Sequence, residues 1–431
     1  MGRRGWLNVW LLLSLCAAQL EASGRFIVRV YGGLPAIQSV CLVAGCTVAQ
    51  GLDGALGQVF LVTTPAFLDD NVTLQKLSSA NGVIDAEADL LAQTADADYT
   101  VPPALSDTTP VEYFGTTVPN GYVNQPATVI TRVVESRRAF KVTGSGIVAV
   151  IDTGVDPNHP ALQAVLLPGY DFTRNRGGAD ETLDVPLTNP PAGTQPTWVS
   201  PNKAATVSQS TAAVVDGNPQ YSDFGHGTMV AGVIHLVAPT AQILPLKAFS
   251  SNGTGYTSDI LRATYFAMAS GAKVINMSFN LASYSQEMAT ALDLATLSGI
   301  ISVAAAGNSG RETLVYPAAL WNVLGIASST NTDQLSSFSN YGRQLVWIAA
   351  PGEGIVTTYP FSAYAAGWGT SFSTPFVSGT AALLVNANGF CDQYGSGQST
   401  EHAAPMDPNA GHGRLDAFQA LQAWTEATGR N

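Results

Sequence analysis

The most regular hydrophobic pattern lies in the second part of the chain, from about residue 143 onward. Short apolar runs such as GIVAVID (146–152), ILPLKAF (243–249) and GIISVAAA (299–306) have the length of buried strands. Between them lie segments with helical spacing, among them TMVAGVIHLVA (228–238) and SDILRATYFAMASG (258–271). Near-continuous apolar strands that alternate with helices are typical of a parallel sheet covered on both faces. We therefore predict a three-layer α/β domain with a mainly parallel sheet.

The pattern of the N-terminal part is different. RFIVRV (25–30) and QVFLVTT (58–64) look like strands, and LQKLSSANGVIDAEAD (74–89) indicates a short helix, a glycine turn and a last strand. These elements predict a small α+β unit over residues 25–93. Residues 94–121 are polar and contain several prolines, which indicates a linker. The larger domain is then expected over residues 122–431.

Two local patterns refine the larger domain. Residues 174–221 are rich in Pro, Asn, Thr and Ser without any period, so we expect an insertion there. In SYSQEMATALDLATLSG (283–299), Ser283 and Gln286 have the spacing of a capping box at a helix start. In GWGTSFSTPFVSGTAALLV (367–385), a helical rhythm follows a run of small residues, which leaves Ser371 at the mouth of a buried helix.

Composition narrows the classes of function. Of the 431 residues, 46% are apolar and only 12% are charged, and the net charge is −12. Binding to nucleic acid begins with neutralisation of phosphates by basic residues, so this balance argues against a nucleic-acid partner. Arg3 and Arg4 precede the apolar run WLNVWLLLSLCAA (6–18) and small residues follow it, which predicts a signal peptide over residues 1–24 and a secreted protein. The run is too short to span a membrane, and no later segment looks membrane-spanning.

The four cysteines do not form a metal-binding pattern. Cys16 leaves with the signal peptide, and Cys391 is expected to be an unpaired buried thiol. Cys41 and Cys46 are close enough to pair in an oxidising compartment, although spacing alone does not establish a disulfide.

Four polar residues fall where a parallel sheet places its active sites, beyond the carboxyl ends of the strands. Asp152 ends a strand, His226 opens a helix, Asn308 lies in a glycine turn after another strand, and Ser371 precedes the last long helix but one. These residue types are an orienting carboxylate, a base, an oxyanion donor and a nucleophile, the groups that acyl transfer requires. A serine hydroxyl is a weak nucleophile until a neutral imidazole accepts its proton, and the imidazole needs a carboxylate to fix its tautomer.

The motifs around these residues resemble those of the subtilisin-like serine proteases. The resemblance rests on DTG (152–154), GHGTMVAG (225–232), AAAGN (304–308) and GTSFSTPFVSG (369–379), in this order, and extends over about 121–428. It implies Ser371 as nucleophile, His226 as general base and acid, Asp152 as its orienter and Asn308 in the oxyanion hole. Since the family binds the substrate backbone as an added strand, Met277–Asn280 and Asn252–Tyr256 are the expected cleft walls.

Within these walls the expected substrate-binding residues are Ser278, Phe279, Asn280, Gly253 and Gly255. The expected substrates are polypeptides. The 25–93 unit resembles the family's propeptide, so we expect a zymogen whose own propeptide is an intramolecular inhibitor. Ala161 stands where many relatives have a calcium-binding aspartate, so that metal site is not expected, no metal ligand is assigned, and calcium elsewhere stays open. Asn280 replaces a common glycine beside the primary specificity pocket, which predicts a narrower pocket.

Two other classes of function remain as alternatives. A non-enzymatic binding module on the same scaffold would have no need for all four polar groups together. An esterase of the α/β-hydrolase type would need a Gly-x-Ser-x-Gly turn and the order Ser, acid, His, and neither is present. Labelling of the serine separates the first alternative from a protease, and turnover of a peptide against a simple ester separates the second.

Overall fold

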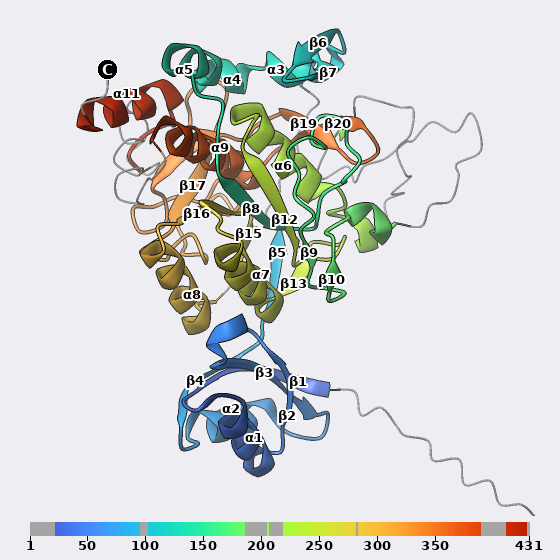
Figure 1. Ribbon diagram of the computed structural model, residues 1–431, viewed down its shortest axis with the longest axis vertical. Helices are drawn as coiled ribbons and strands as arrows, with labels where there is room; N and C mark the ends of the chain where they lie inside the picture. Colours follow the sequence, from blue (N-terminus) through green and yellow to red (C-terminus); the bar gives the residue numbers. More distant parts are fainter. Residues whose placement is uncertain are drawn as a thin grey trace, which may run out of the picture.

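A computed structural model describes residues 22–94, 102–185, 205–206, 219–281, 283–388 and 411–428. The chain forms a small N-terminal unit and a larger domain above it (Figure 1). Most of the predicted signal peptide, Cys16, Cys391 and the greater part of the 174–221 insertion lie outside the described residues. The first strand begins at Ala22, inside the segment predicted to be removed.

The N-terminal unit is an antiparallel sheet with two helices on one face. Its elements are β1 (Ala22–Val30), α1 (Gly33–Ala44), β2 (Thr47–Gly51), η1 (Gly54–Leu56), β3 (Val59–Pro65), α2 (Asp70–Ser78) and β4 (Val83–Ala88), with the strand order β2-β3-β1-β4. Alternate residues of β1, namely Phe26, Val28 and Val30, join Ile37 of α1 and Leu77 of α2 in one small apolar core. The α+β pattern predicted for this unit is therefore present, with α1 as a helix that the pattern did not reveal.

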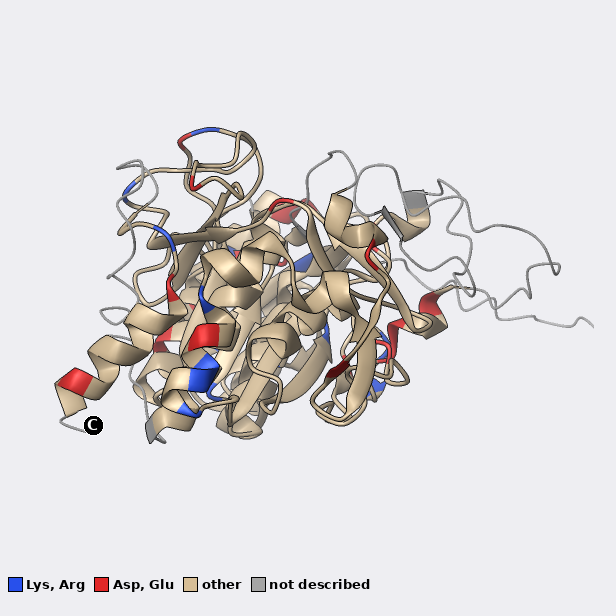
Figure 2. Cartoon of the chain, turned by 90° about the horizontal axis from the view of Figure 1, so that it is seen from above, with Lys and Arg blue, Asp and Glu red and all other residues tan. Residues whose placement is uncertain are grey.

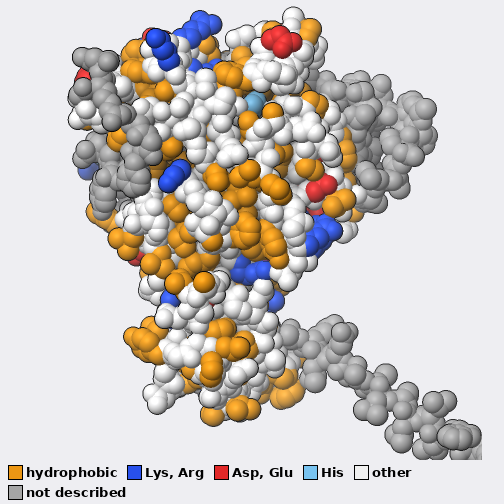
Figure 3. All heavy atoms as spheres, viewed as in Figure 1, with side chains coloured by type: hydrophobic (Ala, Val, Ile, Leu, Met, Phe, Trp, Pro, Cys, Tyr) orange, Lys and Arg blue, Asp and Glu red, His pale blue; other side chains and the backbone are white. Residues whose placement is uncertain are grey.

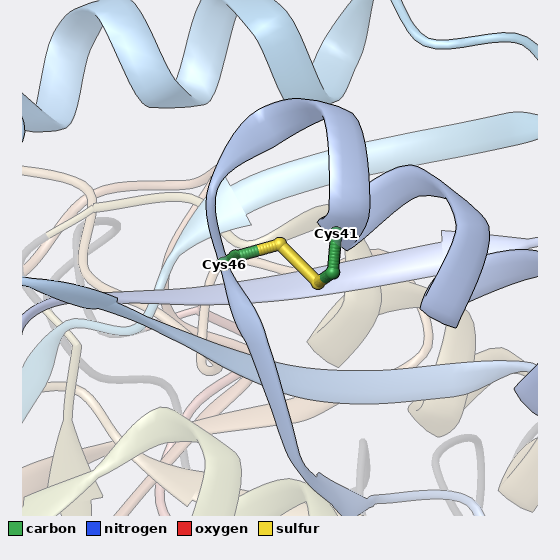
Figure 4. Close-up of a disulfide and its surroundings, with 2 residues drawn as sticks. All are labelled: Cys41 and Cys46. Carbon is green, nitrogen blue, oxygen red and sulfur yellow. A yellow bond between two sulfur atoms is a disulfide. The ribbon is translucent and has the colours of Figure 1, made fainter.

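A disulfide joins Cys41 and Cys46, which the sequence placed close together without establishing a bond. It links the last turn of α1 to the residue before β2 (Figure 4). The bond closes the turn at Gly45, which has φ +80°, a conformation that glycine adopts at little cost.

The linker predicted over 94–121 is folded in its described part, so that prediction was wrong from residue 102 onward. This part contains η2 (Pro103–Ser106), the hairpin of β6 (Pro110–Tyr113) and β7 (Thr116–Pro119), and the start of α3 (Asn120–Val123). Leu105, Tyr113 and Val118 are buried in the main core, and the Tyr113 hydroxyl donates to the Leu236 carbonyl at 2.7 Å. A few apolar side chains anchor this segment, although its composition is that of a loop.

The larger domain is built on an eight-stranded sheet with the order β10-β9-β12-β8-β14-β16-β17-β18, in which all neighbours except β10 and β9 are parallel. The strands are β8 (Ile147–Asp152), β9 (Tyr170–Asp171), β10 (Arg176–Gly177), β12 (Gln242–Lys247), β14 (Val274–Met277), β16 (Ile301–Ala305), β17 (Leu324–Ser329) and β18 (Ile348–Pro351). Smaller strands are β5 (Leu91–Thr94), β11 (Ala205–Thr206), β13 (Thr254–Tyr256), β15 (Phe279–Asn280), β19 (Ile355–Tyr359) and β20 (Ala363–Gly367).

Helices cover both faces of this sheet (Figure 1). They are α4 (Pro126–Ile130), α5 (Val133–Phe140), α6 (His226–Val237), α7 (Thr257–Ala269), α8 (Gln286–Leu297), α9 (Thr370–Asn388) and α11 (Ala417–Thr428), with the short turns η3 (Glu181–Asp184) and η4 (Pro219–Tyr221). Successive residues of β8 point to opposite faces: Val148 and Val150 join the core under α6 and α9, and Ala149 and Ile151 join the core under α7 and α8. The predicted three-layer α/β fold is confirmed.

Charged side chains are sparse on this fold. Most of the ribbon in Figure 2 carries neither sign of charge, and apolar side chains gather over part of the face in Figure 3. Within the described ranges, no helix has both the length and the apolar character that a membrane span requires.

Candidate active site

Asp152 and His226 are in direct contact although 74 residues separate them. The His226 Nδ1–H donates to Asp152 Oδ1 at 2.7 Å, and both side chains are almost completely buried. Asp152 Oδ1 also accepts from the backbone N–H of Thr153 at 2.7 Å, which fixes the carboxylate. With its proton on Nδ1, the neutral ring presents Nε2 as the acceptor.

Two glycines allow the segments that carry this pair to approach. Gly225 has φ +90°, and an added Cβ there would lie 2.3 Å from the Tyr359 ring. A Cβ on Gly227 would lie 2.0 Å from the Gly154 carbonyl oxygen. Gly227 and Gly154 therefore pack backbone against backbone, which brings the first turn of α6 onto the end of β8, and Gly225 lets the same turn pack against Tyr359.

Ser371 lies in the first turn of α9 and is held against the loop after β14. Its Oγ donates to the Ser278 carbonyl at 3.1 Å, and the Ser278 Oγ donates in return to the Ser371 carbonyl at 2.9 Å. That carbonyl would normally accept from the residue four positions on, but Pro375 has no N–H. Ser278 thus supplies the hydrogen bond that the proline removes. The helix begins at Thr370, one residue before Ser371, whereas the sequence placed Ser371 just ahead of the helix.

A second layer of polar groups supports Ser278. Asn276 Nδ2 donates to Ser278 Oγ at 3.0 Å, and Ser378 Oγ donates to Asn276 Oδ1 at 2.8 Å. All of these residues are fully buried. The chain Ser378–Asn276–Ser278–Ser371 connects the middle of α9 back to its first turn, so the position of Ser371 depends on a closed network and not on the helix alone.

Asn308 follows β16 and is oriented by the residue before Ser371. Its Oδ1 accepts from the N–H of Thr370 at 3.0 Å and from the Thr370 Oγ1 at 2.9 Å. The Thr370 Oγ1 in turn accepts from the N–H of Gly307 at 3.0 Å. Nδ2 of Asn308 is buried and makes no hydrogen bond to the described residues. The two N–H groups of the Asn308 amide therefore have a fixed orientation, on the side away from Thr370, and can donate to a ligand.

The expected cleft walls flank a strand of the same chain. β5 pairs antiparallel with β13 on one side, with Gly255 opposite Ala92, and antiparallel with β15 on the other, with Phe279 opposite Thr94. Ala92 is 1% exposed between the two walls. Ser278 immediately precedes β15, so the C-terminal end of β5 lies toward the segment that holds Ser371. Gly253 has φ +75° in the turn before β13.

The Asn280 side chain lies beside the end of β16, next to the segment that carries Asn308. Its Nδ2 donates to the Ala305 carbonyl at 2.8 Å, and its Oδ1 lies 3.0 Å from where a Cβ on Gly307 would stand. The side chain therefore fills space next to the Gly307–Asn308 turn. His159 and His235 are buried away from the site: His159 Nε2 bonds the Ala363 carbonyl, and burial lowers the pKa of His235 to about 4.

Sequence reasoning missed the groups that support the site. Glu181, Thr370 and Asn276 were not singled out, because nothing in their local patterns differs from that of capping or core residues. Glu181 lies in the predicted insertion, where composition gave no signal. The expected capping box is also wrong: Ser285, not Ser283, accepts from Met288 N–H at 3.0 Å at the start of α8. Across the described ranges, no cluster of three or more His, Cys, Asp or Glu side chains has a metal-binding arrangement.

Comparison with known proteins shows the family to which the chain belongs. Residues 144–417 match the model of the subtilase family, Peptidase_S8. Thermitase of Thermoactinomyces vulgaris is 34% identical over 305 residues, which are 67% of this chain and 94% of that protein. Subtilisin Savinase of Lederbergia lenta is 34% identical over 257 residues, 57% of this chain and 79% of that protein.

A solved structure with lower sequence identity shows the same fold. The crystal structure of fervidolysin from Fervidobacterium pennivorans superposes with a TM-score of 0.69 at 21% identity, over 93% of this chain and 61% of that one. Because the family model covers most of the chain and the relatives agree on the same activity, the assignment does not rest on one motif. The chain belongs to the subtilase family and is a subtilisin-like serine endopeptidase.

Proposed function

We propose that this protein is secreted as a zymogen and that Ser371, His226 and Asp152 form its catalytic triad. The observation that carries the proposal is the buried His226–Asp152 pair beside a serine held at the start of α9. The His226 ring packs edge-on against Phe372, the residue after Ser371, with ring centroids 5.8 Å apart. The ring therefore lies next to the backbone that presents the hydroxyl.

In the proposed reaction, Ser371 Oγ attacks the carbonyl carbon of a peptide bond while His226 Nε2 takes the hydroxyl proton. The oxyanion accepts hydrogen bonds from Asn308 Nδ2 and from the backbone N–H of Ser371 at the start of α9. His226 then gives its proton to the leaving nitrogen as the C–N bond breaks. Water next attacks the acyl carbon while His226 Nε2 takes its proton, and His226 returns that proton to Ser371 Oγ as the ester bond breaks and the acid product leaves. The nucleophile, the base and the oxyanion donors of this reaction are all side chains or backbone amides of this chain.

The N-terminal unit is proposed to be the propeptide and the intramolecular inhibitor. The strand that follows its four-stranded sheet in the chain, β5, pairs with β13 and β15 of the larger domain and occupies the space between them, where a polypeptide substrate would add a strand. Asp89 accepts from Ser258 N–H and Oγ, both at 2.8 Å, at the start of α7. Glu87 accepts from Gln286 N–H at 2.8 Å at the start of α8.

A buried ion pair adds to this contact: Arg29 Nη2 lies 2.6 Å from Glu287 Oε2. These hydrogen bonds and the ion pair fix the N-terminal unit against the first turns of α7 and α8, with β5 in the cleft between β13 and β15. Self-cleavage is proposed within residues 95–101, directly after the paired segment. The signal peptide predicted from the sequence and the disulfide in the unit support export from the cell.

The test uses the full-length chain expressed for export. The secreted protein is treated with a fluorophosphonate, and the labelled peptide and the mature N-terminus are identified by mass spectrometry. We expect the label on Ser371, its loss in His226→Ala, and a mature chain that begins within 95–102. A folded, processed protein that takes no label would refute the triad. Labelling without any cleavage of the N-terminal unit would refute the zymogen.

A further inference from the structure

Glu181 is a buried carboxylate that contacts both segments of the proposed triad. It belongs to η3, within the predicted insertion, and has no exposed surface. Its Oε2 accepts from Thr153 Oγ1 at 2.9 Å, directly after Asp152, and from Gly225 N–H at 3.0 Å, directly before His226. One carboxylate thus spans the 74 residues that separate the two triad members in sequence.

The other carboxylate oxygen of Glu181, Oε1, accepts hydrogen bonds from the first turn of α6. Oε1 accepts from Thr228 N–H at 3.0 Å and from the Thr228 hydroxyl. The Thr153 hydroxyl, which donates to Glu181, itself accepts from Gly227 N–H at 2.9 Å. The N-cap residue of α6, Gly225, has no side chain that could cap the helix. Glu181 and Thr153 therefore satisfy the N–H groups around His226 in place of a local cap.

The charge of Glu181 also faces the triad. Burial raises the pKa of Glu181 to about 7, while hydrogen bonds from Thr228 and Thr153 and the charge of Lys247 favour the ionised form. All four hydrogen-bonding partners of the carboxylate are donors, so the ionised form is the one that fits this site. A helix N-terminus carries partial positive charge, which disfavours an imidazolium on its first residue, and an anion placed there offsets it.

The charged and titratable groups that face Glu181 come from three elements. They are Asp152 at the end of β8, Lys247 at the end of β12 and Tyr359 on β19. Lys247 Nζ donates to the Thr153 carbonyl and to Asp184 Oδ2, both at 2.7 Å, so its charge is shared with another carboxylate. Asp152 is bonded to His226 itself, and Glu181 is bonded to Gly225 before it and to Thr228 two residues after it.

We propose that Glu181 is a positioning residue for the proteolytic reaction, which clamps the Asp152 and His226 segments together and stabilises the positive charge that His226 acquires. This inference rests on the proposed triad. Glu181 contacts the triad only through Thr153, Gly225 and Thr228, so its loss should lower kcat more than it changes KM.

The experiment compares Glu181→Gln with the wild-type enzyme, each counted by fluorophosphonate titration of active sites. Glutamine has the same shape but lacks the charge and sets an NH2 group against N–H or O–H donors. We expect kcat per active site to fall by about tenfold or more with KM within about threefold. We also expect the acid limb of kcat/KM to move to lower pH by roughly half a unit to one unit and to follow a single ionisation.

Two further variants separate positioning from folding. Asp180→Asn is the matched control, because Asp180 caps only its own η3 turn, through Thr182, and should keep the wild-type kcat and pH profile. Glu181→Asp keeps the charge but is one methylene shorter, so kcat should fall while the acid limb stays in place. This variant and Thr153→Ala decide the question if Glu181→Gln does not fold.

The outcomes are distinct. Glu181 would be a purely structural residue if Glu181→Gln gave a lower yield of active enzyme but kept the wild-type kcat per site and an unchanged acid limb. The same result in both Glu181→Asp and Thr153→Ala would lead to the same conclusion. Either result would overturn the inference. Failure of the wild-type enzyme to label at Ser371 would instead refute the proposed triad itself.

Discussion

The hydroxyl of Ser278 replaces a hydrogen bond that Pro375 removes from α9, which makes Ser278→Ala a sharp test of how the nucleophile is held. The substitution leaves the Ser371 carbonyl without its donor and Asn276 Nδ2 without its acceptor. Both groups belong to residues with no exposed surface. A buried polar group left unpaired costs about 1–3 kcal/mol, so the two together should destabilise the fold by about 2–6 kcal/mol.

For a chain of this size, that loss corresponds to a fall in Tm of about 2–7 °C. Tm should be measured by circular dichroism in a His226→Ala background, so that self-digestion does not interfere. The same substitution in the otherwise wild-type enzyme should lower kcat by about ten- to a hundredfold, because the backbone of Ser371 loses a constraint that orients its hydroxyl.

Ser298→Ala is the matched control. The Ser298 Oγ also donates to a carbonyl, that of Leu294 at 2.8 Å, but at the exposed end of α8, where water can replace the bond. Its Tm should stay within about 1 °C of the parent. If Ser278→Ala matched this control in both Tm and kcat, the bond from Ser278 to Ser371 would not be what holds the first turn of α9, and the reasoning from Pro375 would be wrong.

Three other predictions follow from the site and from the N-terminal unit. Asp152→Asn should leave the fold intact and lower kcat by about 10⁴-fold, because His226 loses the partner that fixes its tautomer; initial rates on a peptide measure this. Asn308→Ala should lower kcat by about a hundred- to a thousandfold, the loss known for the oxyanion asparagine of subtilisin. Thr370→Val should lower it by about tenfold, and adding Thr370→Val to Asn308→Ala should cost little more, since the threonine acts through the amide; a double-mutant cycle checks this. Removing the short-loop disulfide with Cys41→Ala and Cys46→Ala should destabilise the N-terminal unit by about 2 kcal/mol and lower the yield of mature enzyme, while kcat of the mature enzyme stays unchanged.

The sequence predicted those parts of the fold whose hydrophobic pattern is local. The strands that end at Asp152 and Lys247 are short apolar runs, and the helix that carries Ser371 has a clear helical rhythm. They lie in the structure within a few residues of their predicted positions. The linker was wrong because three apolar side chains, Leu105, Tyr113 and Val118, bury a segment that is otherwise polar. Composition averages over such a segment, whereas packing depends on its few apolar residues.

The residues of the candidate site also fall into two groups, those that local motifs predicted and those that they did not. Asp152, His226, Asn308 and Ser371 stand in recognisable motifs, so their types and order were visible in the sequence. Glu181 and Asn276 act through hydrogen bonds to residues that are distant in the chain, and a glutamate in an irregular segment or an asparagine in a strand has no local signature. Such contacts depend on the packing of the sheet and its helices, which the pattern of one segment does not contain.

Three helices around the site receive a carboxyl group at their N-terminus from a distant segment, and the source differs with the role of the helix. α7 and α8 receive Asp89 and Glu87 from the N-terminal unit, at ends that would face water once that unit had left. α6 receives Glu181 from its own domain, at an end that is fully buried and carries His226. Water can satisfy exposed N–H groups at little cost, so the first two carboxyl groups could be lost if the N-terminal unit is removed as proposed. Water has no comparable access beneath His226, so the carboxylate there has to belong to the part of the chain that remains.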